Sequence, residues 1–138
     1  MVKRIEHRNG TIEHFNENNH WHREDGPAVI YPDGRKEWWI NGKYHREDGP
    51  AIVDPNGKEC WFKNGEFHRE DGPAVILPNG SKDWYKNGKL HREDGPAIVD
   101  PNGTKIWCLN GQDYSFDKWI EALDKSDEEK MELMLYYG

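Results

Sequence analysis

One seven-residue motif, HREDGPA, occurs four times in this chain and constrains its fold more than any other feature. The copies begin at His22, His45, His68 and His91, so the motif returns every 23 residues without an insertion or deletion. A fixed period of this length is typical of repeat proteins, in which each unit packs mainly against its neighbours. The sequence therefore predicts a linear array of similar units.

The residues between the motifs repeat as well and indicate β-structure. Each unit continues with a short β-branched run, a P-[DN]-G turn, an aromatic pair and an Asn-Gly turn. Such runs between proline and glycine are typical of strands, and Asn-Gly suits tight hairpin turns because both residues accept positive φ. We expect an all-β repeat fold, an elongated antiparallel sheet of about five consecutive β-hairpins. A coiled β-solenoid is the alternative.

The array has a different first unit. Residues 1–113 form the expected array, and residues 1–21 are its degenerate capping repeat. There Asn9-Gly10 stands at the position of the P-[DN]-G turn, and His14-Phe15 stands at the aromatic pair. An end repeat has only one neighbour, so its sequence is expected to depart from the others. The full repeats are 22–44, 45–67, 68–90 and 91–113.

Residues 114–138 change from a strand pattern to a helical one. Ser115 is a candidate N-cap, and the apolar residues that follow it recur at helical spacing. Ser126 with Glu129 predicts a capping box at the start of a second helix. We expect the two helices to form a cap over the last apolar edge of the sheet. A helix pair that binds a partner is the alternative. The apolar side of the second helix is predicted to carry Met131, Met134 and Leu135.

Aromatic residues recur in rows along the array. Neighbouring residues of a strand point to opposite faces, so each aromatic pair is expected to place one ring on each side and to form two ladders. A third row precedes each motif, and alternate repeats also differ just before the turn, with Tyr31 and Leu77 against Asp54 and Asp100. The rows are Trp38, Trp61, Trp84 and Trp107; Trp39, Phe62, Tyr85 and Cys108; and Trp21, Tyr44, Phe67 and Leu90.

Composition excludes several classes of partner. The net charge is −7, whereas binding to a phosphate backbone or an anionic membrane needs clustered Lys and Arg. We therefore expect neither nucleic acid nor membrane as a partner. No apolar run has the length of a transmembrane helix or a signal-peptide core, so we expect a cytoplasmic protein. Cys60 and Cys108 lie about two repeats apart, beyond disulfide reach, and are expected to be free core thiols.

The His-Arg-Glu-Asp sets contain residue types that also serve in enzyme active sites. An active site is normally one place, whereas these groups occur in four equivalent copies, so we expect a non-enzymatic protein. We expect each motif arginine to pair with acidic residues of the neighbouring repeat. Successive motif histidines should lie ~9–10 Å apart, two strand spacings, which is too far for all four to share a metal ion. We therefore expect no metal and no cofactor.

The repeat resembles a known family. Pro32-Asp33-Gly34, Trp38, Asn41-Gly42-Lys43 and His45 fit a P-D-G…W-x-x-N-G-K-x-H pattern similar to MORN-type repeats. Typical MORN repeats have Y-x-G before the tryptophan segment and H-G-x-G after it, whereas here the first is shortened and the second is HREDGPA. The HREDGPA variant resembles repeat proteins of large bacteriophages and other large DNA viruses. The resemblance covers residues 22–113 and implies stacked hairpins that act as scaffolds and protein-binding surfaces, with lipid headgroups proposed as ligands for some members.

These observations predict a repeat module that presents a repeated surface to a protein partner. The alternative is a phage-type counter-defence protein, located in the host cytoplasm, that sequesters a small-molecule or nucleotide signal or neutralises a defence or toxin protein. Self-association into a homo-oligomer is left open. The expected binding residues are His22, Arg23, His45, Arg46, His68, Arg69, His91, Arg92, Trp39, Phe62 and Tyr85.

Overall fold

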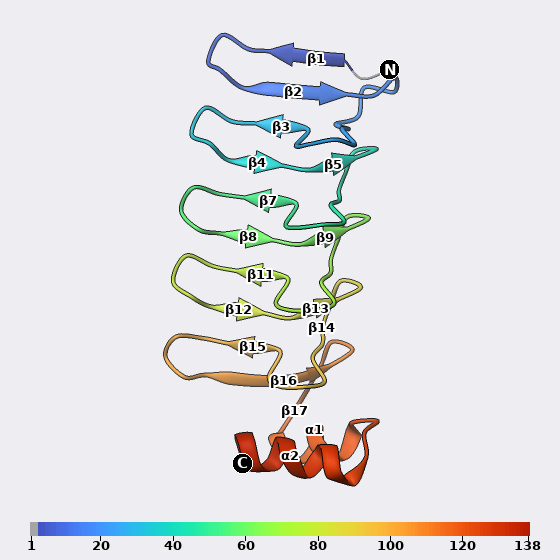
Figure 1. Ribbon diagram of the computed structural model, residues 1–138, viewed down its shortest axis with the longest axis vertical. Helices are drawn as coiled ribbons and strands as arrows, with labels where there is room; N and C mark the ends of the chain where they lie inside the picture. Colours follow the sequence, from blue (N-terminus) through green and yellow to red (C-terminus); the bar gives the residue numbers. More distant parts are fainter. Residues whose placement is uncertain (1–2) are drawn as a thin grey trace.

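A computed structural model describes residues 3–138 and shows a tall stack of β-hairpins with two helices at one end (Figure 1). This confirms the elongated antiparallel all-β fold with a helical cap. Residues 1 and 2 of the expected capping repeat lie outside the described part. The long sheet has eleven strands, and every neighbouring pair for which a register is given is antiparallel. In sheet order they are β1 (Lys3–Glu6), β2 (Ile12–Phe15), β3 (Val29–Ile30), β4 (Lys36–Glu37), β7 (Ile52–Val53), β8 (Glu59–Cys60), β11 (Val75–Ile76), β12 (Lys82–Asp83), β15 (Ile98–Val99), β16 (Lys105–Leu109) and β17 (Gln112–Tyr114).

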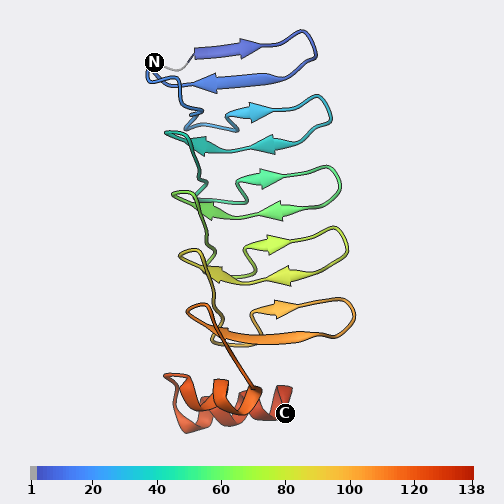
Figure 2. The same ribbon diagram turned by 180° about the vertical axis from the view of Figure 1, so that it is seen from behind.

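Each of the first three full repeats adds a second, smaller hairpin beside the long sheet. The P-[DN]-G turns close the main hairpins along one edge, and the Asn-Gly turns close the small hairpins along the other (Figures 1 and 2). Asn41 and Gly42 have φ of 48° and 77°, so both residues of this turn are left-handed, as the sequence predicts. The small ladders pair β5 (Trp39–Ile40) with β6 (Lys43–Tyr44), β9 (Phe62–Lys63) with β10 (Glu66–Phe67), and β13 (Tyr85–Lys86) with β14 (Lys89–Leu90).

The aromatic side chains form one stack where the sequence predicted separate rows. The second ring of each aromatic pair alternates with the ring that precedes the next motif, because the small hairpin brings these two positions opposite each other, as with Trp39 and Tyr44. Neighbouring ring centroids are 3.8–4.9 Å apart. The stack therefore runs across the repeat boundaries and fills the thin core. Its members are Trp21, Trp39, Tyr44, Phe62, Phe67 and Tyr85.

The two C-terminal helices close the end of the stack that follows the last repeat (Figure 1). They are α1 (Phe116–Ala122) and α2 (Asp127–Tyr137). Ser115 caps α1, and the capping box of Ser126 and Glu129 at α2 is present as predicted. Trp119 is fully buried against Trp107 of β16. This end of the sheet is therefore covered mainly by α1.

The expected apolar side of α2 does not cover the sheet. Leu133 and Tyr137, one helical turn apart, pack against the cap core. Met131, Met134 and Leu135 lie on the remaining surface and are exposed, together with Tyr136. The prediction for this helix face was wrong because the contact line follows Leu133 and Tyr137. Within residues 3–138, neither helix has the length and apolar character needed to cross a bilayer.

Candidate functional site

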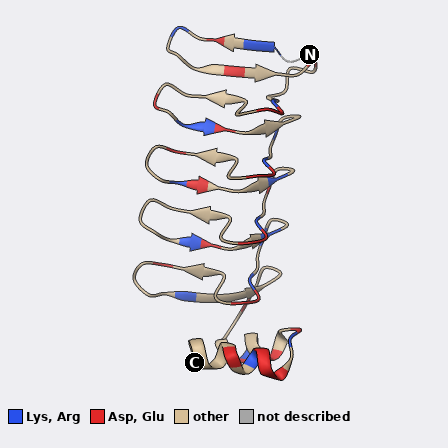
Figure 3. Ribbon diagram, in the orientation of Figure 1, with Lys and Arg blue, Asp and Glu red and all other residues tan. Residues whose placement is uncertain are grey.

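The four HREDGPA motifs follow one another along the edge of the Asn-Gly turns, and their charged residues recur there in Figure 3. Each motif histidine holds the turn of its own repeat. Nδ1 of His45, for example, accepts a hydrogen bond of 3.0 Å from the backbone N–H of Asn64. Because Nδ1 is an acceptor, the neutral ring carries its proton on Nε2, which lies 2.8 Å from the carboxylate of Glu47. Nδ1 of His22, His68 and His91 accepts the equivalent hydrogen bond from the backbone N–H of the asparagine in its own repeat.

Three of the four motif arginines, Arg46, Arg69 and Arg92, are each fixed by three contacts. The guanidinium carbon of Arg46 lies 3.8 Å from the ring centroid of Trp38 in the preceding repeat, a cation–π contact. Its Nε donates to Asp48 at 3.1 Å, and its Nη1 donates to the carbonyl of Pro50 at 3.0 Å. The acidic partner therefore belongs to the same motif, which corrects the expected pairing with the neighbouring repeat. A Cβ at Gly49 would lie 2.9 Å from the Arg46 guanidinium carbon, so a larger residue there would shift this arginine from its position.

These arginine contacts also correct the expected tryptophan ladder. Trp61 and Trp84 are covered by Arg69 and Arg92 in the same way as Trp38, with distances of 3.9 and 3.8 Å. The tryptophans are therefore separated by guanidinium groups from the following repeat. Trp107 differs, because it packs against rings of the helical cap.

The most accessible groups of the motifs are the carboxylates. The side chains of the motif Glu and Asp residues are 54–87% exposed, whereas the motif histidines are only 12–16% exposed. The hydrogen bond and charge of Arg23 lower the pKa of Asp25, and a hydrogen bond from His68 lowers the pKa of Glu70. Both groups are therefore ionised at neutral pH, and the edge presents repeated negative charge.

Shallow cavities lie along this edge. Three of them, with volumes of 770, 540 and 510 Å³, lie between consecutive motifs, and one of 850 Å³ lies beside the first motif. The walls of the three cavities between motifs include the arginine on its tryptophan and the exposed carboxylates of two repeats. The edge therefore carries a row of similar, open cavities.

The sequence-predicted binding residues form two sets. The histidines and arginines lie along the motif edge, where most of their polar atoms already have partners within the chain. Trp39, Phe62 and Tyr85 belong to the aromatic stack instead, and Phe62 is buried. The exposed glutamates and aspartates of the motifs were not singled out from the sequence, although they stand beside the predicted residues.

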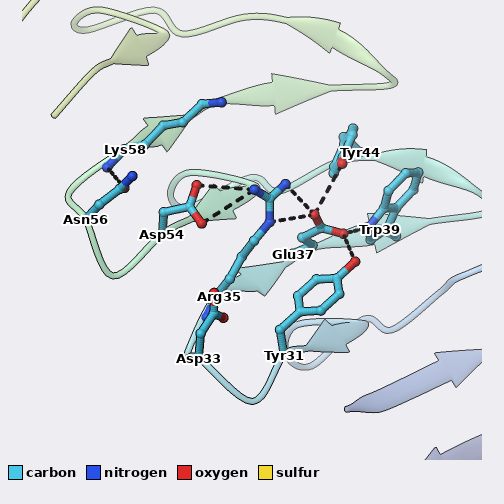
Figure 4. Close-up of polar contacts among 9 residues, drawn as sticks. All are labelled: Tyr31, Asp33, Arg35, Glu37, Trp39, Tyr44, Asp54, Asn56 and Lys58. Carbon is cyan, nitrogen blue, oxygen red and sulfur yellow. Dashed lines mark hydrogen bonds and ion pairs between the residues drawn. The ribbon is translucent and has the colours of Figure 1, made fainter. Parts of the chain in front are cut away.

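A buried polar cluster around Glu37 was also missed from the sequence (Figure 4). The Glu37 side chain is 4% exposed and pairs with Arg35, whose Nη2 lies 2.6 Å from Oε2. Trp39 Nε1 donates to Oε1 at 3.1 Å, and the hydroxyls of Tyr31 and Tyr44 lie 3.4 Å from the carboxylate. Burial and the Glu37 charge raise the pKa of Tyr44 to about 12, so this hydroxyl remains a donor. The other repeats have Cys60, Asp83 and Ile106 at this position, so the repeat pattern gives no signal of the cluster.

The two cysteines are free and buried, as predicted. Burial raises the pKa of both thiols, that of Cys108 to about 12, and Cys108 Sγ donates to Asp113 at 3.2 Å. These groups are therefore poor nucleophiles. In the part of the chain that the structure describes, no three side chains of metal-ligating type converge.

The fold and the motif edge together define a β-hairpin repeat protein with a helical cap. A comparison with models of known protein families finds no match, and neither does a comparison with curated proteins. The arguments for function therefore rest on the geometry of the repeats.

Proposed function

We propose that this chain is a non-enzymatic repeat module that binds a protein partner along the motif edge. The observation that carries the proposal is the row of four equivalent motifs, whose carboxylates are exposed while their histidines and arginines are held within the chain. Ionised carboxylates at regular intervals favour a partner segment with several Lys or Arg side chains. Binding at several equivalent positions would raise the overall affinity without requiring a strong single contact.

The charge of the motif edge also discriminates between the two forms of the counter-defence alternative, a small-molecule or nucleotide ligand and a protein target. The cavity volumes suit small ligands, but the exposed carboxylates would repel the phosphates of a nucleotide. Neutralisation of a basic defence or toxin protein in the host cytoplasm agrees better with this charge. This reading also agrees with the resemblance of the motif to repeat proteins of large viruses, and it needs no enzymatic activity.

Stepwise neutralisation of the motifs tests the proposal. Glu47→Gln with Asp48→Asn removes the two negative charges of one motif and keeps its His and Arg, and the same pair of changes can be added in a second and a third motif. We expect capture of partners from a host lysate to fall with each motif changed and to weaken as salt is raised. The matched control changes the exposed Glu128 and Glu132 of α2. Equal loss in the control, or complete loss from one motif alone, would contradict a repeated binding edge.

A further inference from the structure

In the first half of the array, one guanidinium joins carboxylates of two adjacent repeats. Arg35 pairs with Glu37 of its own repeat, and its Nη1 lies 3.2 Å from Oδ2 of Asp54 in the next repeat (Figure 4). Strand β4 carries Glu37 and pairs with β7, and Asp54 directly follows β7. The cation therefore balances two acids across a repeat boundary.

The second half of the array places two acids in the same way but has no cation between them. Strands β12 and β15 pair in the register that relates β4 to β7, so Asp83 takes the place of Glu37. Asp100 directly follows β15, and the register places Ser81 opposite it, where the first half has Arg35. The difference between alternate repeats in the sequence thus corresponds to a pair of acids at every second boundary.

The carboxylate of Asp83 also lacks the other donors that surround Glu37. No hydrogen bond or ion pair is formed by the side chain of Asp83 or Asp100 with any residue from 3 to 138. Burial and the nearby charge of Asp100 raise the pKa of Asp83, as expected for two unbalanced acids. The donors Tyr31, Trp39 and Tyr44 of the first half are replaced by Leu77, Tyr85 and Leu90.

A second, independent observation concerns Ser81. This residue is only 6% exposed, yet among the described residues its hydroxyl has no hydrogen-bond partner. Every fully enclosed polar side-chain atom of the described chain does have a partner, so the Ser81 hydroxyl must reach the surface. Strand alternation puts Ser81 on the same face as Asp83. The register and this alternation therefore put three groups that can accept hydrogen bonds, one hydroxyl and two carboxylates, on one face of the sheet at a single repeat boundary.

We propose that Asp83, Asp100 and Ser81 form a binding site for a guanidinium group, the side chain of an arginine that comes from outside this chain. The guanidinium is favoured because the same register binds one in the first half of the array. Its fork of N–H donors can reach two carboxylates at once, which a compact ammonium does less well. A metal ion is disfavoured because no third carboxylate, histidine or cysteine converges with these two acids within the described chain.

Titration with blocked arginine tests the site. N-acetyl-arginine amide is added while the carboxyl carbon resonances of the full chain are followed by NMR, and N-acetyl-citrulline amide is the neutral isosteric control. We expect saturable shifts at Asp83 and Asp100 with arginine and none with citrulline. The exposed Asp117 of α1 and Asp127 of α2, which lie outside the HREDGPA motifs, report on general ionic effects. Equal shifts at those residues, or equal shifts with citrulline, would overturn the proposal, as would binding of Mg²⁺ or Ca²⁺ without binding of the arginine amide.

Variants locate the site. Asp83→Asn and Asp100→Asn should each abolish the shifts, and Ser81→Ala should weaken binding. Ser81→Arg should also abolish binding, because the new side chain can occupy the site as Arg35 does in the first half. Unchanged binding in Ser81→Arg or in Asp83→Asn would overturn the assignment.

Free L-arginine distinguishes the source of the ligand: tighter binding of the free amino acid indicates a metabolite, and equal or tighter binding of the blocked amide indicates a partner's side chain. A variant in which the motif carboxylates are neutralised should still bind the arginine amide at Asp83 and Asp100. This result would separate the site from binding at the proposed motif edge.

Discussion

The guanidinium of Arg46 covers the indole of Trp38 across a repeat boundary, with 3.8 Å between its carbon and the ring centroid. The same contact recurs at the next two boundaries. Trp107 has no repeat after it, and Trp119 of α1 lies 4.6 Å from it instead, centroid to centroid. The helical cap therefore does for the last tryptophan what the next motif does for each of the others.

Replacing Arg46 by alanine should destabilise the protein by about 1–3 kcal/mol, because the cation–π contact and two hydrogen bonds are lost together. Arg46→Lys should recover only part of this, since lysine keeps the charge but not the planar fork. Urea unfolding measures the effect, with the exposed Lys63→Ala as control, expected within about 0.5 kcal/mol of wild type. An Arg46→Ala value in the control range would show that the boundary contact adds no stability.

Gly65→Val should destabilise the protein by about 1–2 kcal/mol or more, because Gly65 has φ of +81° and a β-branched residue is strained there. Gly88→Val should behave alike at φ of +78°. Gly65→Asn is the matched control, because asparagine tolerates this conformation, and it should cost less. Urea melts that do not separate Val from Asn would contradict the turn geometry.

Glu37→Gln should destabilise the protein by about 2 kcal/mol, because it removes the negative charge that pairs with the partly buried Arg35 and accepts hydrogen bonds from Trp39 and the tyrosine hydroxyls. The change in free energy of unfolding can be measured with urea. Glu66→Gln, an exposed change of the same type, is the control and should be near neutral. If the two substitutions cost the same, the Glu37 cluster is not a stabilising feature.

Asp83→Asn should stabilise the protein at neutral pH. The pKa of Asp83 is raised above the ordinary 3.8 by burial and by Asp100, so folding favours the protonated acid. That contribution is fully present below the unfolded pKa and is lost as pH rises through the folded pKa. The advantage of asparagine should therefore appear at pH 7 and vanish below about pH 3.8. Thermal melts across this range measure it, and a variant less stable than wild type at pH 7 would refute the expectation.

Deleting residues 114–138 should cause self-association more than loss of β-structure. Trp107 and Leu109 are each only 9% exposed in the full chain, and the deletion uncovers both of them at the end of an open sheet. Light scattering and circular dichroism measure the two outcomes separately. A truncated chain that remains monomeric at high concentration would show that the helices are not a protective cap.

The repeat period allowed the stacking of hairpins to be predicted, because turns at Asn41-Gly42 and its equivalents depend on local backbone preferences. The capping box of Ser126 and Glu129 was predictable for the same reason. The aromatic stack was not, since the pairing of Trp39 with Tyr44 depends on a small hairpin that strand alternation alone does not reveal. Which face of α2 packs against the sheet also depends on tertiary contacts. The spacing of apolar residues therefore could not show that Leu133 is packed and Leu135 exposed.

The sequence shows which residues make up the motif edge, but it does not show which of their side chains point outward. A sequence shows that Arg46 and Asp48 recur together, but not that tryptophan from the preceding repeat fixes the arginine and leaves the carboxylates outside. The cluster at Glu37 could not be predicted from the repeats, because the other full repeats have no glutamate at this position. A repeat pattern carries no information about a residue that occurs in one unit alone.

The contacts between Arg46 and Trp38, and their equivalents, all run in one direction along the chain, so the array has two unlike ends and the same arginine–tryptophan contact at each boundary between full repeats. Inserting one further 23-residue unit inside the array would recreate a boundary of the same kind and disturb neither end. Each such unit would lengthen the molecule by roughly 10 Å, two strand spacings. The reach of this protein can therefore change in fixed steps, by duplication or loss of whole units, without a new fold having to be found at any step.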